Sequence, residues 1–517
     1  MMGADYSGKY DIVIIGSGIG GLTCACLLSG RGKKVLLLEQ SSRLGGCCAS
    51  YELDGHRFDV GAIFVLYKEL YERFFEMMGL KLEDHINMKL LDPVYDMRFR
   101  DGTSMLMPMD AFKTAEEISL FAPGDSQGWL EFCKQMKRIW ETAKILVDKP
   151  FPSLEEFGTP KHLAKTAWNL KILKAIPAIL GVIFTNQEKV NKKYFKDKKT
   201  LTIVSFENLF AGIPSNRING IFAVMSYLAH EGYWYPEGGM GAIPEALARI
   251  ARSNGTEIKM KSLVKKIIVE NKRAVGVILE DGEQIPARVV ISNASAIPTY
   301  LDLVGRENLP VRFAKAIEGY TLSIPAPMVY FGLKDKPPEV RCHFTVMVPP
   351  PEQLNAYWDE YYAEGLLPPI ADTPHGLIAP SMTFPDMAPP EKFSLGLLAA
   401  GPYRLKYHSW DDIKPAFIEE SLAHLARTFS PKITSLVEAK DMRTPVDFER
   451  ELLLPEGSIY GLEMSIPNMG PFRPSWRSPV IKNLYLTGAS TNPGGGVPLV
   501  MLSGINASAC LIRDMNW

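Results

Sequence analysis

A short segment near the start of the chain restricts the possible folds more than any other feature of the sequence. Residues 11–15 (DIVII) form an apolar run, which is typical of a strand buried on both faces of a parallel sheet. A glycine-rich turn follows, then a helical pattern over 22–29 that ends at Gly30 and Gly32, and then a second apolar run over 35–38 (VLLL). The order strand, turn, helix, strand predicts a βαβ unit and hence a parallel α/β sheet.

The turn of this unit has the spacing of a dinucleotide-binding loop, GxGxxG, at Gly16, Gly18 and Gly21. In such a loop the first glycine permits the tight turn, the second lets a pyrophosphate approach the backbone, and the third lets the helix pack closely on the strand. Glu39 follows the second strand, where an acid that binds a ribose hydroxyl is expected. An ordinary glycine turn explains the hexapeptide alone, whereas the whole pattern predicts a dinucleotide site.

Glycine-rich segments elsewhere predict which parts of the chain complete this site. RLGG (43–46) follows the second strand, and FDVGA (58–62) comes soon after. Near the C-terminus, LYLTGAS (484–490) leads into PGGGVP (493–498), whose last proline suits the start of a final helix over 498–512. Backbone N–H groups at the start of that helix could face a ring that becomes anionic on reduction.

These motifs, together with YPEGGMG (235–241) and VVISNA (289–294), resemble those of the carotenoid (phytoene) desaturase-related FAD oxidoreductases, within the amine-oxidase and glutathione-reductase-like flavoprotein superfamily. The matches run from residue 11 to about 512 and are loosest in the middle of the chain. The resemblance implies an α/β protein that binds FAD non-covalently. Its Rossmann-like FAD-binding domain would be discontinuous, with an inserted α+β substrate-binding domain.

The resemblance also implies how the chain is divided. The FAD-binding domain would be assembled from three segments and the substrate-binding domain from two. The FAD segments are 1–90, 231–296 and 446–517, and the substrate segments are 91–230 and 297–445. Helical patterns dominate 70–230, whereas 349–390 holds ten prolines and is expected to be an irregular or edge region.

The same resemblance implies which residues contact FAD. The N-terminal motifs would hold the ADP and ribityl part, Ala62 and Ile63 would approach the isoalloxazine ring, and the backbone of Val264 would touch adenine. The C-terminal glycine turn would contact the ribityl chain and the ring. The full set is Gly16, Gly18, Gly20, Gly21, Glu39, Gln40, Arg43, Gly45, Gly46, Gly61, Ala62, Ile63, Val264, Gly488, Ala489, Gly496, Val497 and Pro498.

One position departs from the family pattern. Many relatives have a histidine before the PGGG run, where this chain has Asn492. Asparagine can hydrogen-bond but cannot carry a proton near neutral pH, so a histidine-dependent step is in doubt.

The sequence leaves the catalytic residues unassigned. Glu231 is the main candidate for a proton donor or acceptor, with Tyr233 beside it, although a surface glutamate among core aromatic residues fits the pattern equally well. Cys47 and Cys48 follow the double glycine and are expected to pack rather than to form a redox pair. The eight histidines have no metal-ligand spacing, so no metal is expected.

Charge and cysteine content limit the partners and the location. Lys and Arg number 57 against 58 Asp and Glu, and a net charge of −1 argues against a nucleic-acid-binding surface. Seven cysteines without a CxxC pair indicate a reducing compartment. No apolar run is long enough to cross a bilayer. We therefore expect a cytoplasmic protein, with peripheral attachment to the inner face of the membrane as an alternative.

The attachment alternative depends on residues 160–199. Ten lysines and only two acids give this segment a charge of +8, which leaves −9 for the rest of the chain. One interpretation is a solvated helical face. The other is a monotopic membrane anchor, in which the apolar run 175–184 lies in the headgroup layer and the flanking lysines bind anionic lipid.

The sequence as a whole predicts an FAD-dependent oxidoreductase that desaturates, saturates or isomerises a long apolar isoprenoid or carotenoid-like substrate by hydride transfer at flavin N5. Only one dinucleotide motif is present, so electrons would pass to a quinone, to O₂ or to a redox partner. The substrate tunnel would be lined by the Met- and aromatic-rich segment 205–235. Two alternatives remain: an amine-oxidase-like flavoprotein for a smaller substrate, and a non-catalytic prenyl- or lipid-binding escort protein. Glycine motifs retained at both ends of the chain favour the enzyme.

Overall fold

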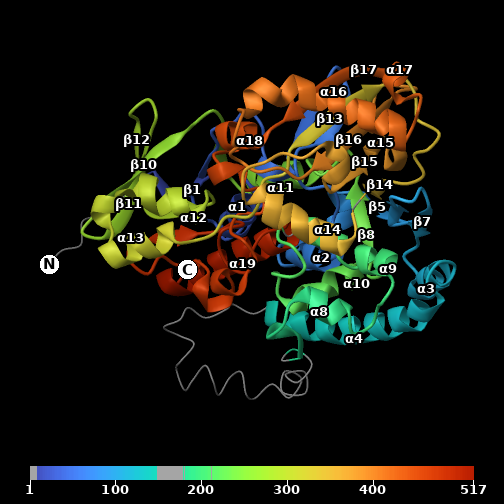
Figure 1. Cartoon of the computed structure of the whole chain (residues 1–517). Coiled ribbons are helices and arrows are strands. Elements are labelled where there is room, and N and C mark those ends of the chain that lie inside the picture. The colour runs from blue at the N-terminus through green and yellow to red at the C-terminus, as the bar shows by residue number, and fades with distance from the viewer. Residues whose placement is uncertain (1–8, 148–178, 180, 211, 348) are drawn as a thin grey trace.

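The structure, a computed structural model, describes residues 9–147, 179, 181–210, 212–347 and 349–517. Its strands form two seven-stranded sheets and two small two-stranded ones. The first large sheet lies on the left of Figure 1 and the second at the upper right, with a group of helices at the lower right.

The first sheet contains the predicted βαβ unit. Two of its strands form an antiparallel extension of β12, namely β10 (Val264–Glu270) and β11 (Arg273–Leu279). The parallel strands are β18 (Leu484–Leu486), β12 (Gln284–Ser292), β1 (Tyr10–Ile15), β2 (Val35–Leu38) and β9 (Glu257–Lys259). The apolar runs are buried as predicted, because all of β2 and the last four residues of β1 are inaccessible to solvent.

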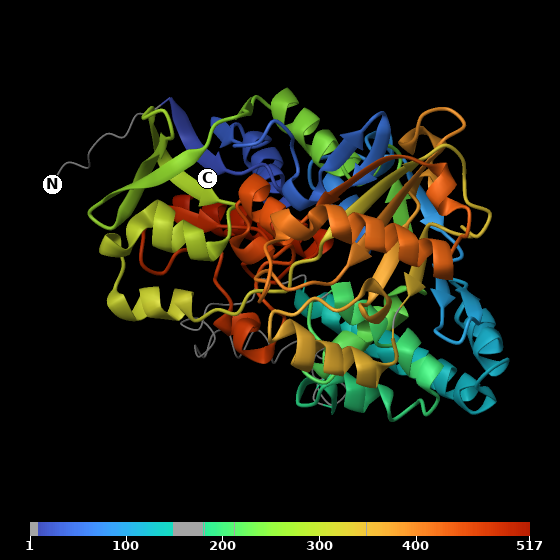
Figure 2. The same ribbon diagram turned by 45° about the horizontal axis from the view of Figure 1, so that its top comes forward.

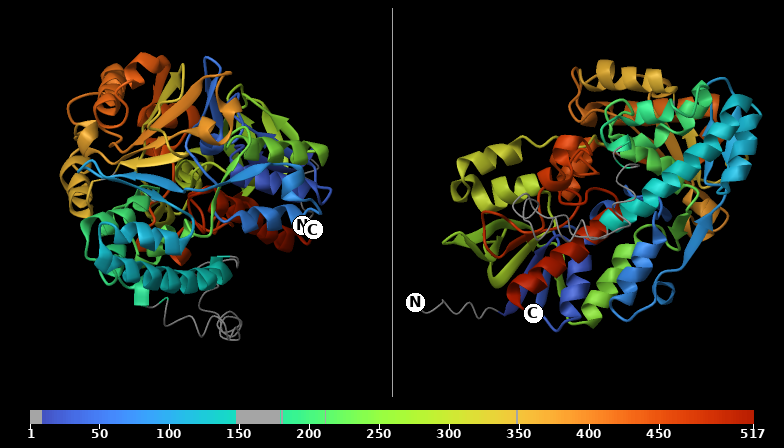
Figure 3. Two further views of the ribbon diagram at one scale, coloured as in Figure 1. Left: turned by 90° about the vertical axis from the view of Figure 1, so that its right-hand side faces the viewer. Right: turned by 90° about the horizontal axis from the view of Figure 1, so that it is seen from below.

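Helices cover both faces of this sheet, which explains why β1 is apolar at successive positions. On one face α1 (Ile19–Ser29) lies beside α11 (Ala242–Ser253) and α19 (Val497–Met515), as the view from below in Figure 3 shows. Ile12 and Ile14 belong to the same core as these helices. On the other face, Val13 and Ile15 pack in a core with residues of α13 (Val311–Glu318).

The end of α1 differs in part from the prediction. The helix ends at Ser29 as predicted, but Gly30 keeps a right-handed conformation with φ −61°. Gly32, with φ +74°, is the residue that adopts the left-handed conformation available to glycine. The left-handed turn is therefore found at Gly32 and not at Gly30.

The second sheet is largely antiparallel; only β6 and β14 run parallel to each other. One of its faces packs against α16 (Trp410–Thr428), seen across the strands in Figure 2, through Phe417, Leu422 and Leu425. Its strands in order are β17 (Val437–Arg443), β13 (Met328–Leu333), β16 (Phe393–Ala399), β15 (His375–Ile378), β14 (Phe344–Met347), β6 (Tyr95–Arg98) and β7 (Ser104–Met107).

The sequence predicts an irregular or edge region over 349–390. Most of this span forms short helices and turns, but it also contributes one interior strand, so the edge alternative is wrong. β15 pairs with β14 on one side and β16 on the other. The prolines do not prevent this pairing, since Pro374 and Pro380 flank the strand and none lies within it. A proline disrupts a sheet only where its missing N–H would join the ladder.

The remaining elements connect and cover the sheets. The two small sheets pair β3 (Ser50–Leu53) with β4 (His56–Asp59), and β5 (Met88–Leu91) with β8 (Tyr233–Pro236). The helices at the lower right of Figure 1 and beside the sheets are α2 (Lys68–Glu76), α3 (Ala111–Ser119), α4 (Pro123–Val147), α8 (Gln187–Asn191), α9 (Lys198–Ile203) and α10 (Val224–Leu228). Shorter helices are α12 (Ala296–Pro298), α14 (Pro351–Ala356), α15 (Pro380–Thr383), α17 (Ile433–Leu436) and α18 (Pro445–Leu452). The described part of 70–230 is mainly helical from α3 onward, after three strands.

The fold class predicted from the sequence is confirmed: a Rossmann-like sheet is assembled from distant parts of the chain around an inserted second sheet. The domain limits remain a proposal. Strands of the first sheet come from the proposed FAD segments and strands of the second from the proposed substrate segments. The proposed limit at residue 90 falls inside β5, so it separates residues of one strand.

The stability of the second sheet is expected to depend on Asp96, whose side chain is fully buried in β6. Its carboxylate accepts hydrogen bonds from Arg98 Nε at 2.9 Å and Arg341 Nε at 3.0 Å. Asp96→Ala removes the charged acceptor of two partly exposed arginines and should lower the free energy of unfolding by about 1.5–3 kcal/mol. Urea unfolding followed by circular dichroism measures this loss.

The matched control is Asp372→Ala, which removes a largely exposed ion pair with Arg100 at 3.4 Å. It should cost about 1 kcal/mol or less because exposed pairs are well solvated. Equal losses in the two variants would mean that the Asp96 cluster does not stabilise the sheet.

Candidate functional site

A cavity of about 430 Å³ opens at the edge of the first sheet where its parallel strands end. Four residues that come just after β1, β2, β12 and β18 line this cavity, namely Gly16, Glu39, Asn293 and Gly488. Ligands of open α/β sheets bind at this edge, outside the carboxyl ends of the strands. The volume is in the range typical of small-molecule sites.

The first glycine loop brings bare backbone to the cavity. Gly16 has φ +92°, a conformation that side chains other than glycine rarely adopt. At Gly21 an added Cβ would lie 2.2 Å from the carbonyl oxygen of Gly16, so only glycine lets α1 approach the loop this closely. The start of α1 therefore presents N–H groups where a phosphate can approach.

The predicted ribose acid is held in a fixed orientation. Glu39 is buried and accepts hydrogen bonds from the N–H and hydroxyl of Ser17, at 2.8 and 2.6 Å, and from the N–H of Ser41 at 2.8 Å. Each carboxylate oxygen can still accept from a ligand. These neighbours preorganise Glu39 as an acceptor for hydroxyl groups.

The opposite wall is formed by the C-terminal glycine turn and the start of α19. Gly496 caps the helix with φ +96°, and no side chain caps its first turn. Val497–Val500 line the cavity, so the positive end of the helix dipole faces its interior. The helix begins at Val497, one residue before the predicted start, so Pro498 is its second residue and not its first.

Beyond Ala62 and Ile63 the cavity becomes apolar. Its wall there includes Tyr67, which has a strained left-handed backbone (φ +54°) and an edge-to-face contact with Trp140 at 5.1 Å between ring centroids. Strained residues of this kind tend to occur at functional sites. The apolar lining residues from α4, α10 and the loops are Phe64, Leu66, Trp140, Phe222, Met225 and Leu228.

The structure brings most of the predicted contact residues to this one cavity. Those that line it are Gly16, Gly18, Glu39, Gln40, Gly45, Gly46, Gly61, Ala62, Ile63, Val264, Gly488, Ala489, Gly496, Val497 and Pro498. Gly20 and Gly21 lie behind the lining, where an added Cβ at Gly20 would meet Thr487 Oγ1 at 2.6 Å. Their contact with a cofactor remains a prediction.

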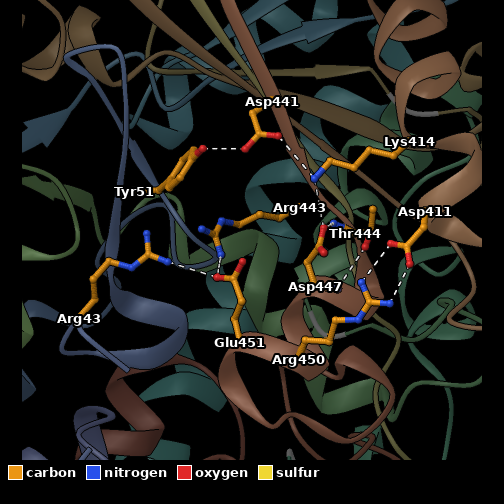
Figure 4. Close-up of polar contacts among 10 residues, drawn as sticks. All are labelled: Arg43, Tyr51, Asp411, Lys414, Asp441, Arg443, Thr444, Asp447, Arg450 and Glu451. Atoms are coloured by element: carbon orange, nitrogen blue, oxygen red, sulfur yellow. Dashed lines mark hydrogen bonds and ion pairs between the residues drawn. The ribbon is translucent and has the colours of Figure 1, made fainter. Parts of the chain in front are cut away.

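Arg43 is also outside the lining. Figure 4 shows its guanidinium directed at Glu451, 3.2 Å away, in a polar cluster that includes Arg443 and Tyr51. The amide of Gln40 donates to the carbonyl of Glu451 at 3.1 Å. Arg43 therefore joins the RLGG loop to the end of α18, rather than projecting into the cavity.

The candidate proton-transfer residue does not reach the cavity either. Glu231 accepts a hydrogen bond from the hydroxyl of Tyr227 and lies 4.0 Å from Lys144 Nζ, away from the lining. Cys47 and Cys48 do line the cavity, and burial raises the pKa of the Cys47 thiol to about 12. A thiol with that pKa is protonated at neutral pH and is a poor nucleophile.

Sequence reasoning missed two parts of the site. Asn293 follows β12 and accepts from the N–H of Gly21 at 3.1 Å; its place after a parallel strand is a usable signal. The segment 458–464 contributes Tyr460, Gly461 and Met464 to the wall. No local motif identifies this segment, because it reaches the cavity only through packing on the C-terminal glycine turn.

Metal-binding and membrane-spanning features are limited in the part of the chain that the structure describes. No group of three His, Cys, Asp or Glu side chains could hold a metal ion. One helix, α19, is long and apolar enough to cross a membrane by length and composition alone, but it packs against α1 in the protein core.

The parallel sheet and the glycine loops at its edge together define a Rossmann-like α/β protein. The family described as flavin containing amine oxidoreductase matches residues 19–512, and the chain belongs to this family. It is a flavin-dependent oxidoreductase.

Individual proteins are similar over the full length. The zeta-carotene-forming phytoene desaturase of Myxococcus xanthus is 28% identical, covering 100% of this chain and 96% of its own. The carotenoid 3,4-desaturase of Haloarcula japonica is 28% identical, covering 99% and 100%. The crystal structure of an oxidoreductase from Methanosarcina mazei has the same fold, with a TM-score of 0.62, 17% identity, and coverage of 96% and 99%.

Glu39→Ala is expected to weaken the binding of FAD. The ribose hydroxyls lose a charged acceptor, which is worth about 1.5–3 kcal/mol, or a roughly 10- to 150-fold rise in Kd. Isothermal titration of apoprotein with FAD measures the change. Glu257→Ala is the control, since Glu257 lies on the neighbouring strand β9, is half exposed and pairs with Lys9. Unchanged affinity in Glu39→Ala would show that the ribose acid is misassigned.

Proposed function

We propose that the protein binds FAD non-covalently and uses it to introduce double bonds into a long apolar isoprenoid substrate of the carotenoid class. The observation that carries the proposal is a single cavity in which glycine loops suited to a dinucleotide continue into an apolar chamber. The names of the two similar desaturases support the same substrate class.

The residues of the site fit a dinucleotide better than a mononucleotide flavin. The lining includes Val264 and Glu39 as well as the C-terminal turn with Pro498, so it offers partners for an adenosine as well as for a ring. Non-covalent binding is supported by the protonated state of the Cys47 thiol, which disfavours attack on a flavin. Denaturation should then release the flavin into the supernatant.

The apolar substrate class is supported by the small number of carboxylates in the lining of the cavity. Glu39 is the only carboxylate among the described residues that line the cavity, and it is held by Ser17 in the first glycine loop. Among these lining residues an amine substrate would find no acidic partner beside the apolar wall. The escort alternative is disfavoured by the glycine turns at both ends of the chain, because a lipid carrier has no need of them.

The protein itself would bind the cofactor and the substrate, orient them and exclude water from the site. Bound FAD would supply the hydride acceptor, at N5 of its ring. The apolar wall from Phe64 to Leu228 would hold the substrate chain beside the ring and keep water from the reacting carbons. No side chain is assigned as the proton acceptor, and the electron acceptor is proposed to be a quinone, O₂ or a redox partner.

The test of this function is anaerobic reduction of the bound flavin by a linear C40 polyene supplied in liposomes. Loss of the oxidised flavin absorbance, with an additional double bond in the recovered polyene, is expected. Phe222→Asp places a charge in the apolar wall and should abolish this reduction while leaving flavin bound. Val311→Asp, an exposed position on α13, is the control and should behave like the wild type.

The remaining outcomes separate the alternatives. Reduction by a primary amine but not by the polyene would favour the amine-oxidase function. Polyene binding without any flavin reduction would favour an escort protein. Saturation or isomerisation of the polyene would support the same binding site but would show that the protein catalyses a different reaction from desaturation.

We further propose that 160–199 attaches the protein to the membrane from the cytoplasm. Residues 160–178 and 180 lie outside the described part of the chain. Within the described part, Phe184 is 81% exposed, which supports an apolar contact with lipid. Three lysines are already paired, Lys192 with Glu188, Lys198 with Glu352 and Lys199 with Asp101, so the free charge is smaller than the sequence indicates.

Anionic liposomes should sediment the wild type at low salt and release much of it at high salt, because the Debye length shortens from about 10 Å at 0.1 M to about 3 Å at 1 M. Changing five lysines to Gln should weaken the binding; these are Lys192, Lys193, Lys196, Lys198 and Lys199. Neutral liposomes are the control. If the wild type stays in the supernatant with anionic liposomes at low salt, the segment is a solvated face.

A further inference from the structure

Arg473 is a buried arginine whose hydrogen bonds go to backbone carbonyl oxygens. Arg473 is only 3% exposed to solvent. It donates to the carbonyls of Thr491 at 3.0 Å, Asn468 at 2.9 Å, Leu462 at 3.2 Å and Ala489 at 2.5 Å. A further contact joins Nη1 to the sulfur of Met464 at 3.6 Å. The guanidinium is thus fixed in position by two separate stretches of chain.

No carboxylate pairs with this guanidinium among the residues that the structure describes. Burial lowers the pKa of Arg473 to about 10, so it remains charged at neutral pH. Buried Arg443, by contrast, is ion-paired with Glu451. A buried charge normally has a partner, because leaving it unpaired is costly. The five N–H groups of Arg473 are all engaged, but its positive charge is not neutralised by an ion pair, so it can act on a nearby anion through its field.

The guanidinium lies directly behind the wall of the cavity. Met464 and Ala489, which it contacts, both line the cavity, and an added Cβ at Gly494 would be 3.7 Å from its Cζ. The carbonyl oxygens of Ala489 and Thr491 point to Arg473, so they do not present negative charge to the cavity. The start of α19 adds the positive end of its dipole at the same wall.

This wall is therefore positive, and its charge favours an anion that forms beside it. An oxidised isoalloxazine ring is neutral, whereas addition of two electrons and one proton leaves it with one negative charge. We propose that Arg473 stabilises the reduced flavin ring over the oxidised one and so raises the reduction potential of the bound cofactor. The inference rests on the proposed binding of FAD in this cavity.

The pyrophosphate of FAD is the other anion that the charge of Arg473 could stabilise. Stabilisation of the pyrophosphate and stabilisation of the reduced ring differ in a measurable way. Pyrophosphate carries its charge in both redox states, so loss of Arg473 would weaken oxidised and reduced FAD equally. A ring anion exists only after reduction, so its partner affects the reduced form selectively. Arg473 contacts Ala489 in the C-terminal glycine turn, and this turn adjoins both the start of α19 and, through Gly488, the start of α1. The redox dependence of FAD binding therefore decides between the two anions.

The experiment compares Arg473→Met with Arg473→Lys, using FAD as the ligand. The Kd of oxidised FAD is measured by titration, and the midpoint potential by anaerobic reduction with dithionite against a reference dye. In Arg473→Met the affinity for reduced FAD should fall at least tenfold more than that for oxidised FAD, which lowers a two-electron potential by about 30 mV. Arg473→Lys keeps the charge and should keep the potential near that of the wild type.

Two controls keep the test informative if Arg473→Met folds poorly. Met464→Glu places a carboxylate beside the guanidinium and should give a lower potential than Met464→Gln, which changes the same wall residue without adding a charge. Arg443→Met removes a buried but paired arginine away from the cavity and should leave the potential unchanged.

Equal loss of oxidised and reduced FAD in Arg473→Met would assign the charge to the pyrophosphate and overturn the proposal. An unchanged potential in both Arg473→Met and Met464→Glu would overturn it as well. Wild-type protein that binds no FAD would contradict the proposed function itself, which is a separate result.

Discussion

The structure depends on one close approach of backbone to backbone, between the start of α1 and the loop after β1. An added Cβ at Gly21 would lie 2.2 Å from the carbonyl of Gly16, so this contact requires glycine. It fixes α1 on the sheet, with every residue of the helix buried, and turns the helix N-terminus toward the strand ends. The other strands of the sheet then bring Glu39, Asn293 and Gly488 to the same edge.

The two halves of the cavity follow from this arrangement. The parallel sheet supplies loops with exposed N–H groups, which suit phosphates and a ring that gains electrons. The inserted part of the chain supplies Trp140, Phe222 and Met225, which suit an apolar chain. A flavin held between them would have a polar side for its own charge and an apolar side for the substrate. The buried cation of Arg473 lies behind the polar side.

The sequence was most informative where local chemistry decides the structure. The βαβ unit, the glycine loops and Glu39 could be predicted because turns that need glycine and strands that need apolar residues leave a local pattern. Interior strand β15 was missed because proline content was given more weight than its placement. Asn293 was missed although it directly follows a parallel strand. Met464 and Arg473 leave no local pattern, since their positions depend on contacts between segments distant in the chain. Arg43 has the right motif, but Glu451, which binds it, lies about 400 residues away, at 3.2 Å in space.

The central claim is that flavin and an apolar chain occupy one continuous cavity. It is tested most directly by titrating the FAD-loaded protein with a fully conjugated C40 polyene, which cannot be desaturated further, and recording the flavin absorbance spectrum. A saturable shift of the flavin bands at one polyene per protein is expected, and it should be weakened in Trp140→Ala. Polyene binding with no change in the flavin spectrum would place the two ligands in separate sites and contradict a shared cavity.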